Sequence, residues 1–158
     1  MSCIGFWCWD DHFSFVVLSG TADEPSLQGR GSRRAPKGLP RPEALQWLRR
    51  EVHEVLNTHS PQRAYYKATE GNSRTKDLRR GEFEGVLQEA AASHQLRLII
   101  EGRVKAQVKR DTAFQRPARY LDHLLQHPAL ADVSTPTYCE ACLAALCGLV
   151  REAGSGTL

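Results

Sequence analysis

Five acidic residues of the sequence could supply carboxylates to a metal site. Asp10 and Asp11 form a polar tip between two apolar runs, Glu70 and Glu101 follow short apolar segments, and Glu140 lies near the C-terminus. Carboxylate oxygens are the hard ligands that magnesium and manganese prefer, and two such metals about 4 Å apart can activate a water for hydrolysis. Acids at the ends of strands are also ordinary residues of solvated loops. We predict loop positions for the first four acids and keep a metal site as the alternative.

Cysteine and histidine offer a second kind of chemistry. Cys139 and Cys142 form a C-x-x-C pair, which could join Cys3 and Cys8 in a zinc site. Cys3 and Cys8, however, are separated by four residues of a predicted strand, so their side chains point to opposite faces. Cys147 follows in the same Ala- and Leu-rich segment as the C-x-x-C pair. We therefore predict that the C-terminal cysteines pack as small hydrophobic side chains of a helix.

The histidines form no recognisable ligand or nucleophile–base motif. The nearest pairs are His53 with His59 and His123 with His127, and we expect all four at the surface. A glycine-rich phosphate loop and a G-x-S-x-G elbow are both missing from the sequence. The sequence alone therefore predicts no metal and no other cofactor, with magnesium or manganese as the alternative.

The composition is typical of a globular domain. The 158 residues are 41 % hydrophobic and 25 % charged, which is enough for one core. The net charge of +3 is too small to indicate nucleic-acid binding by itself. The five cysteines have irregular spacing and form no disulfide framework, which favours a reducing cytoplasm. The N-terminus lacks the features of a signal peptide, and no apolar run approaches the roughly 18 residues of a membrane span, so we expect no membrane partner.

Basic side chains are clustered in three places, which favours binding of phosphates with a strong dependence on salt. The candidate nucleic-acid-binding residues are Arg74, Lys76, Arg79, Arg80, Arg103, Lys105, Lys109, Arg110, Arg116 and Arg119. Acids such as Glu82 and Glu84 interrupt the first cluster. A merely solvated surface therefore stays open as the alternative.

The periodicity of apolar residues predicts the elements that must position these side chains. We expect strands at 3–9, 12–18, 60–69 and 96–102, and helices at 42–56, 75–94, 116–127 and 138–151. Residues 20–42 read as a basic loop that includes a short edge strand near 26–32. This order predicts a mixed sheet with helices packed on it, in a single domain over residues 1–153 with a flexible tail at 154–158.

Three stretches of the sequence resemble one known family. "IGFWCWDDHFSFVVL" (4–18) is similar to its first hairpin, of the form "LGIDPGxxxxGxxV". Residues 60–92 resemble its central strand and following helix, where "GxxxGVxxxAA" is filled from Gly81 to Ala91, and "LRLIIEGRVKAQVKR" (96–110) resembles a strand and basic segment. The family is that of the RuvC-type Holliday-junction resolvases. The resemblance implies an α/β, ribonuclease-H-like fold: a mixed five-stranded sheet with helices on both faces.

The resemblance also implies where catalytic acids would stand, and this chain departs from it there. The aspartate position of the first strand falls on Trp7, and the glutamate position of the central strand falls near Tyr66 or Lys67. In the D-x-x-D place of the last helix, "TYCE" has Thr137 for the first acid and keeps Glu140. Tryptophan cannot ligate magnesium and lysine would repel it, so the metal site implied by the family is degenerate.

These departures predict a catalytically inactive RuvC-like pseudo-nuclease. It would act as a nucleic-acid-binding or scaffolding subunit of a larger nucleoprotein assembly, with a protein partner or a second copy of the chain. Trp7 and Trp9 would then seal a core or anchor a partner. The alternative is a metal-dependent, structure-selective endonuclease with a rebuilt site drawn from the five acids, Asp10, Asp11, Glu70, Glu101 and Glu140.

Overall fold

A computed structural model describes residues 1–67, 78–96, 98–100 and 123–155 of the chain. The elements follow the order β1 (Ser2–Cys8), β2 (His12–Gly20), β3 (Pro25–Arg34), α1 (Arg41–His59), β4 (Arg63–Tyr66), α2 (Leu78–Ser93), β5 (Leu98–Ile100), η1 (Pro128–Leu130) and α5 (Cys139–Ser155). The predicted helix at 116–127 lies largely outside the described residues. The same holds for the loop before α2 and for parts of the segments predicted around β4 and β5.

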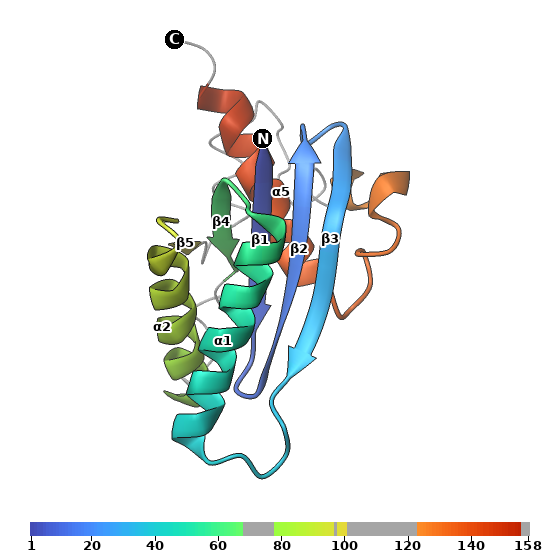
Figure 1. Cartoon of the computed structure of the whole chain (residues 1–158). Helices are drawn as coiled ribbons and strands as arrows, with labels where there is room; N and C mark the ends of the chain where they lie inside the picture. Colours follow the sequence, from blue (N-terminus) through green and yellow to red (C-terminus); the bar gives the residue numbers. More distant parts are fainter. Residues whose placement is uncertain (68–77, 97, 101–122, 156–158) are drawn as a thin grey trace.

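The five strands form one mixed sheet in the order β3-β2-β1-β4-β5. Strands β1, β2 and β3 form an antiparallel meander, whereas β4 and β5 run parallel to β1 (Figure 1). The predicted hairpin of β1 and β2 is confirmed, and its tip is closed by a 2.9 Å bond from the Trp9 N–H to the His12 carbonyl. Because β1 and β4 are parallel neighbours, their carboxyl ends lie together at the same end of the sheet.

Strand β3 is longer than the short edge strand that the sequence predicts. It pairs with β2 from Pro25 to Arg34, with one irregularity opposite Val17 and Leu18. Its glycines leave room for rings from other elements: a Cβ on Gly29 would stand 2.4 Å from the His59 ring, and one on Gly31 would stand 2.5 Å from the Phe15 ring. Glycines that read as loop signals in the sequence are therefore sites of close packing in a strand.

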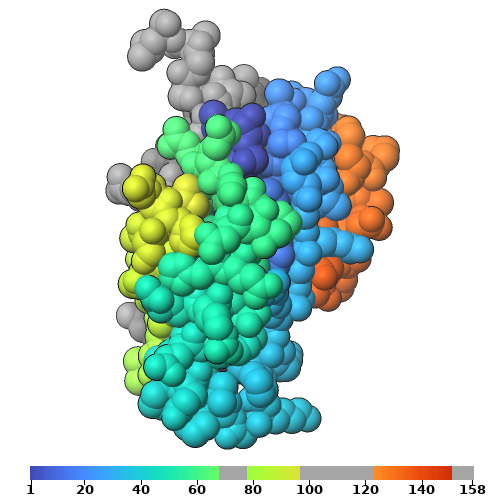
Figure 2. Space-filling view, in the orientation of Figure 1, coloured from blue at the N-terminus to red at the C-terminus, as the bar shows by residue number. Residues whose placement is uncertain are grey.

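The sheet has a separate hydrophobic core on each face, because successive side chains of a strand point to opposite sides. Ile4, Phe6 and Cys8 of β1 are buried with residues of α1 and α2. Cys3 is buried on the other face with residues of α5. The prediction that Cys3 and Cys8 face opposite sides is confirmed, as is a sheet with helices on both faces. Atoms of α1 cover the middle of the face that Figure 2 presents.

Helix α1 is held to the sheet by an apolar stripe and to α2 by polar pairs. It buries Leu48, Val52 and Leu56 at spacings of four residues, as the periodicity predicts. The Arg49 guanidinium bonds to the Glu89 carboxylate of α2 at 2.7 Å. The two helices are therefore joined along their exposed side as well as through the core.

A second link between the helices is a contact between two histidines. Nδ1 of His53 lies 2.7 Å from Nε2 of His94, which follows α2. Burial lowers the pKa of His53 below its ordinary value of 6.5, and the charges of Arg49 and His94 lower it further against the opposing effect of Glu89. The hydrogen bond requires one ring nitrogen to be unprotonated, because two protonated imidazoles have no acceptor to offer.

Acid should therefore weaken this packing. The unfolded chain binds a proton at His53 more readily than the folded chain does, so stability is present above about pH 6.5 and is lost as the pH falls below it. We expect the thermal melting midpoint to drop between about pH 7.5 and about pH 5. In His53→Gln, which cannot titrate at this position, the drop should be smaller. An equal drop in both proteins would contradict this role for His53.

Helix α5 lies unusually close to β1 on the other face of the sheet. A Cβ added to Gly5 would stand 2.0 Å from the Ala141 carbonyl oxygen and 2.5 Å from the Ala145 amide nitrogen. Gly148 is equally confined, since a Cβ there would meet the Tyr65 ring and the Cys3 sulfur at 2.6 Å and 2.9 Å. The close approach of the β1 backbone at Gly5 to the α5 backbone at Ala141 and Ala145 determines where the start of α5 lies. The helix extends to Ser155, four residues beyond its predicted end.

No helix in the described parts of the chain combines the length and the apolar character needed to cross a membrane.

Candidate functional site

The carboxyl ends of β1 and β4 bring Trp7 and Lys67 side by side. Phe6 is paired with Tyr66, and the Lys67 N–H donates to the Phe6 carbonyl at 3.1 Å. Trp7 follows Phe6 and Lys67 follows Tyr66, so these two residues are neighbours across the strands. Trp7 packs against the core on the α5 side. Lys67 contacts α5 as well, so both side chains belong to the face that α5 covers.

Lys67 forms an ion pair with Glu140 in the first turn of α5. The side chains are 20 % and 36 % exposed, so the pair is partly shielded from solvent. A carboxylate in the first turn of a helix is favoured by the helix dipole, and the Lys67 ammonium neutralises it directly. The pair thus joins the end of the central strand to the start of the last helix.

These residues do not fit a divalent metal. At the positions where the resemblance implies acids, Trp7 offers no ligand atom and Thr137 is an exposed residue just before α5. The central-strand position offers either the Tyr66 phenol or the positive charge of Lys67. Glu140 is the one carboxylate among them, and its charge is already balanced by Lys67. A two-metal site needs several converging carboxylates, which this set does not supply.

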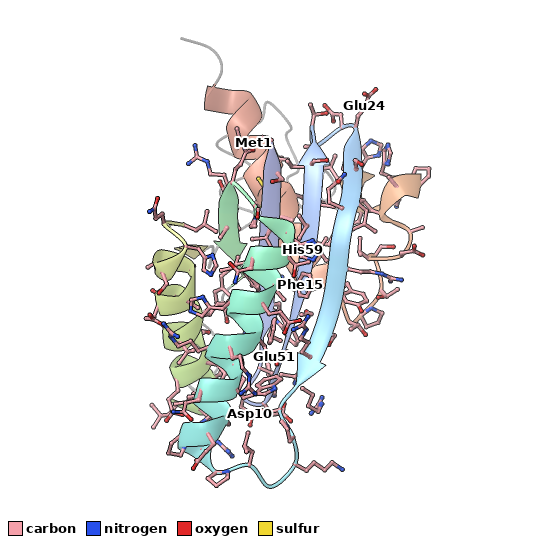
Figure 3. All side chains as sticks on the ribbon, viewed as in Figure 1. Met1, Asp10, Phe15, Glu24, Glu51 and His59 are labelled. Carbon is pink, nitrogen blue, oxygen red and sulfur yellow. The ribbon has the colours of Figure 1, made fainter. Side chains whose placement is uncertain are left out.

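Asp10 and Asp11 lie at the hairpin tip between β1 and β2, where Figure 3 labels Asp10. The Asp11 carboxylate lies 2.6 Å from His12 Nδ1 and accepts from Arg34 at 2.5 Å, and these contacts, His12 first, lower its pKa. The Asp10 carbonyl accepts from Arg41 at 2.7 Å. Their predicted role as acids of a polar turn is consistent with these bonds.

Three of the five candidate acids, Asp10, Asp11 and Glu140, lie in the described chain. Glu70 and Glu101 lie outside the described residues. In the ranges that are described, no three His, Cys, Asp or Glu side chains are grouped so that they could hold a metal ion. Asp10, Asp11 and Glu140 are therefore not gathered into such a group by the fold.

Two of the ten predicted nucleic-acid-binding residues lie in the described chain. Arg79 is exposed at the start of α2. Arg80 is 6 % exposed, so the expectation of a surface contact is wrong for this side chain. The helix turns it toward the sheet, where a buried phenol, a carboxylate and two indoles surround it. The other eight, Arg74, Lys76, Arg103, Lys105, Lys109, Arg110, Arg116 and Arg119, lie outside the described residues.

Arg80 belongs to a buried polar network at the carboxyl end of the sheet. The Tyr66 hydroxyl donates to the Glu84 carboxylate at 2.6 Å and accepts from the Arg80 guanidinium at 3.3 Å, and the Cys8 thiol donates to the same hydroxyl at 3.5 Å. Burial raises the pKa of Cys8 to about 11 and also raises the pKa of Tyr66. Both groups stay protonated at neutral pH, so this network has a structural role rather than a nucleophilic one.

The sequence does not predict the contact between the Arg80 guanidinium and the two tryptophan rings. The rings of Trp7 and Trp9 are stacked at 5.8 Å and 27°, and the Arg80 guanidinium lies 5.8 Å from the first and 4.9 Å from the second. His12 meets Trp7 edge-on at 5.8 Å. The one sequence signal was the pair of tryptophans two residues apart on a strand, which places both on one face.

The cysteines near the C-terminus pack as predicted. Cys142 and Cys147 are buried in the core beneath α5, and Cys139 is half-buried. Burial raises the pKa of Cys142 to about 12, so its thiol is a poor metal ligand and a poor nucleophile at neutral pH.

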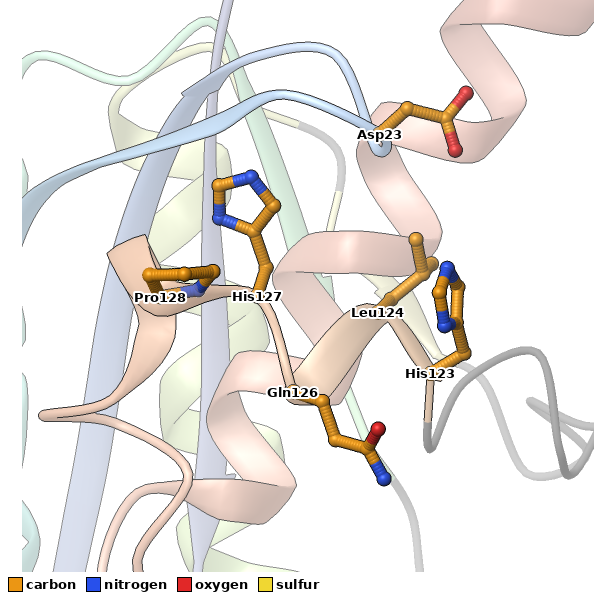
Figure 4. Close-up of a pocket in the computed structure, with 6 residues that line it drawn as sticks. All are labelled: Asp23, His123, Leu124, Gln126, His127 and Pro128. Atoms are coloured by element: carbon orange, nitrogen blue, oxygen red, sulfur yellow. The ribbon is translucent and has the colours of Figure 1, made fainter.

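A surface hollow between the β2–β3 turn and η1 holds both histidines of one predicted surface pair (Figure 4). His123 and His127 lie apart in this view, with Leu124 between them. The His127 ring accepts from the Ala129 N–H at 3.1 Å and so caps η1. Its position is explained by this cap, without a metal.

Structural comparison decides the fold. Thermus thermophilus RuvC superposes with a TM-score of 0.79 over 98 % of this chain and 97 % of its own, at 16 % identity. The same protein in complex with a Holliday junction substrate gives 0.76 over 99 % and 98 %, at 20 % identity. The chain has the RuvC fold. The yeast mitochondrial Holliday junction resolvase Ydc2 gives 0.63 over 96 % of this chain and 79 % of its own, at 11 % identity.

The predicted ribonuclease-H-like fold of the RuvC type is therefore confirmed for this RuvC-like domain. Neither the protein-family models nor the curated proteins contain a match to its sequence. The likeness lies in the order and pairing of the elements, which survive at identities where individual side chains do not.

Proposed function

We propose that this RuvC-like domain binds nucleic acid without cutting it, as a subunit of a larger nucleoprotein assembly. The observation that carries the proposal is the ion pair between Lys67 and Glu140 at the carboxyl ends of β1 and β4. An enzyme that hydrolyses phosphodiesters with two metals needs several converging carboxylates to hold them. Here an ammonium group takes the position next to the one remaining acid.

The nucleic-acid part of the proposal is supported by the fold. One superposing structure is of RuvC with a Holliday junction substrate, and another is of a Holliday junction resolvase. Apart from the buried Arg80, the sequence adds nine basic candidates, of which Arg79 is exposed at the start of α2. Binding through such side chains neutralises phosphates and releases counterions, so the affinity should fall steeply with salt.

The non-cutting part follows from electrostatics. A lysine ammonium and a divalent cation cannot share the Glu140 carboxylate without strong repulsion. The cation beside Glu140 is the Lys67 ammonium, which belongs to the chain. A chelator that removes metal ions would therefore leave this pair intact. Substrate phosphates at this place would meet a neutralised carboxylate and an indole, neither of which activates water.

The test is a combined binding and cleavage assay on a four-way junction, a duplex and a single strand. We expect binding in chelator and in magnesium or manganese alike, an affinity that falls with salt, and intact substrates. The matched variants are Glu140→Ala and Glu24→Ala, since Glu24 is an exposed acid of the β2–β3 turn. Cleavage that is lost in the first and kept in the second would contradict the proposal and favour the metal-dependent endonuclease.

The partner in the assembly is either another protein or a second copy of the chain. A second copy would appear as a dimer in sedimentation of the purified protein. A monomer that still binds the junction would favour a different protein as the partner.

A further inference from the structure

The two tryptophans and Arg80 form a rigid stack at the end of β1, which we call the Trp9 platform (Trp7, Trp9 and Arg80). Trp7 is held from one side by the core beneath α5 and from another by the edge of His12. Arg80 is buried and is bound to Tyr66. Two of the three members of the platform are thus fixed by contacts that do not involve Trp9.

The three distances place Arg80 on the same side of Trp9 as Trp7. If the guanidinium lay on the opposite face of the Trp9 ring, its distance to Trp7 would approach the sum of the other two distances. It is instead 5.8 Å, which equals the separation of the two rings. Neither Trp7 nor Arg80 therefore covers the outward face of Trp9.

The exposure of Trp9 agrees with this geometry. The residue is 43 % exposed, although tryptophan is normally largely buried. The Trp9 N–H is bonded to the His12 carbonyl, so the backbone that carries the ring is part of the closed hairpin. An ordered aromatic face, open to solvent and supported from behind by a second indole and a cation, is a preformed surface for stacking.

Trp9 is the one aromatic ring among the exposed large hydrophobic side chains of the described residues. Across the described residues, the large hydrophobic side chains that are exposed are Met1, Trp9 and Leu78. Met1 lies at the other end of β1, far from the hairpin tip (Figure 3). A stable protein–protein interface buries about 800 Å² on each partner with several apolar anchors, which Trp9 and Leu78 alone do not provide.

We propose that the Trp9 platform binds an unpaired nucleobase of a single-stranded or branched nucleic acid by stacking on the outward face of Trp9. The inference rests on the proposed nucleic-acid binding. It adds that the protein recognises an unpaired base of the nucleic acid. Every base offers a π-face, so this contact favours unpaired strands over duplex without reading sequence. Bases inside a duplex are stacked on one another and cannot reach the ring.

The experiment measures fluorescence anisotropy of labelled oligonucleotides with the full chain. The ligands are a single strand, the same strand with abasic sites, and a duplex, and the variants are Trp9→Ala, Trp9→Phe and Leu78→Ala. We expect Trp9→Ala to weaken binding of the base-bearing strand about tenfold and to leave duplex binding within about twofold. Trp9→Phe should retain most of the affinity, and Leu78→Ala should match the unmodified protein. The unmodified protein should bind the abasic strand as weakly as Trp9→Ala does.

A second readout is tryptophan fluorescence in Trp47→Phe, in which Trp7 and Trp9 are the remaining tryptophans. Stacking of a base on Trp9 should quench this fluorescence with the base-bearing strand and not with the abasic strand.

The outcomes separate this inference from the proposed function. Equal binding of the base-bearing strand by Trp9→Ala and the unmodified protein, with duplex binding retained, would overturn the platform and leave the proposed function standing. An equal loss on all ligands with a lower melting midpoint would mean that Trp9 supports the fold, which also overturns the inference. Absence of binding to every nucleic acid would overturn both.

Discussion

Gly5→Ala should destabilise the protein by about 3 kcal/mol or more, a large part of the roughly 5–15 kcal/mol by which a typical domain is stable. The added methyl group would overlap the Ala141 carbonyl oxygen and the Ala145 amide nitrogen, at 2.0 Å and 2.5 Å. Both are backbone atoms of α5, so no side chain can rotate away to relieve the overlap. The helix would have to move off β1 and carry Glu140 away from Lys67. Urea denaturation followed by circular dichroism measures the loss.

The matched control is Gly85→Ala in α2, because a Cβ there would meet no atom within 4 Å. Alanine is favoured over glycine in an exposed helix by up to about 1 kcal/mol, so this variant should be as stable as the unmodified protein or slightly more stable. Equal stabilities for the two variants would contradict the close packing of α5 on β1.

Arg80→Met should destabilise the protein by about 3 kcal/mol, although methionine keeps much of the aliphatic volume. The guanidinium is nearly fully buried, donates to the Tyr66 hydroxyl at 3.3 Å and lies 3.5 Å from the Glu84 carboxylate. Its removal leaves these two groups without their cation in a place that water reaches poorly. Thermal and urea denaturation at neutral pH measure the effect.

Arg50→Met provides the control for this variant. Arg50 is an exposed arginine of α1, where such a substitution usually changes stability by less than about 0.5 kcal/mol. If Arg80→Met were no more destabilising than Arg50→Met, the network around Tyr66 would not be a stabilising feature of the fold.

The central elements could be predicted from the sequence because their signals are local. The alternation of Ile4, Phe6 and Cys8 with residues of the other face predicted β1, and the observed strand differs by one residue at each end. Spacings of four residues between Leu48, Val52 and Leu56 predicted α1. In both elements the pattern of burial follows directly from the period of the backbone.

Strand β3 was underestimated because its structure depends on contacts with distant residues. Gly29 and Gly31 read as loop residues, yet they receive the rings of His59 and Phe15 in a regular strand. The full length of β3 is set by its pairing with β2, and no local propensity encodes that pairing.

The candidate site was predictable in its individual residues and not in its arrangement. Comparison with the family pattern located Trp7 and Glu140, and it left the central-strand position open between Tyr66 and Lys67. Their meeting depends on how α5 is seated over Gly5, which brings Glu140 to Lys67. Arg80 was expected at the surface as one of a cluster of basic residues around the start of the helix, but the helix directs it inward, where it is buried.

The packing of α5 on β1 also affects how the chain folds during synthesis. The two elements that make the closest backbone contact, Ser2–Cys8 and Cys139–Ser155, lie near opposite ends of the sequence. The ribosome therefore releases β1 long before the helix that covers it, and the core on this face of the sheet is completed only when α5 emerges. Contacts between such distant segments slow folding and expose apolar surface to aggregation. Synthesis of this domain therefore has a vulnerable interval, which ends only when α5 docks onto Gly5.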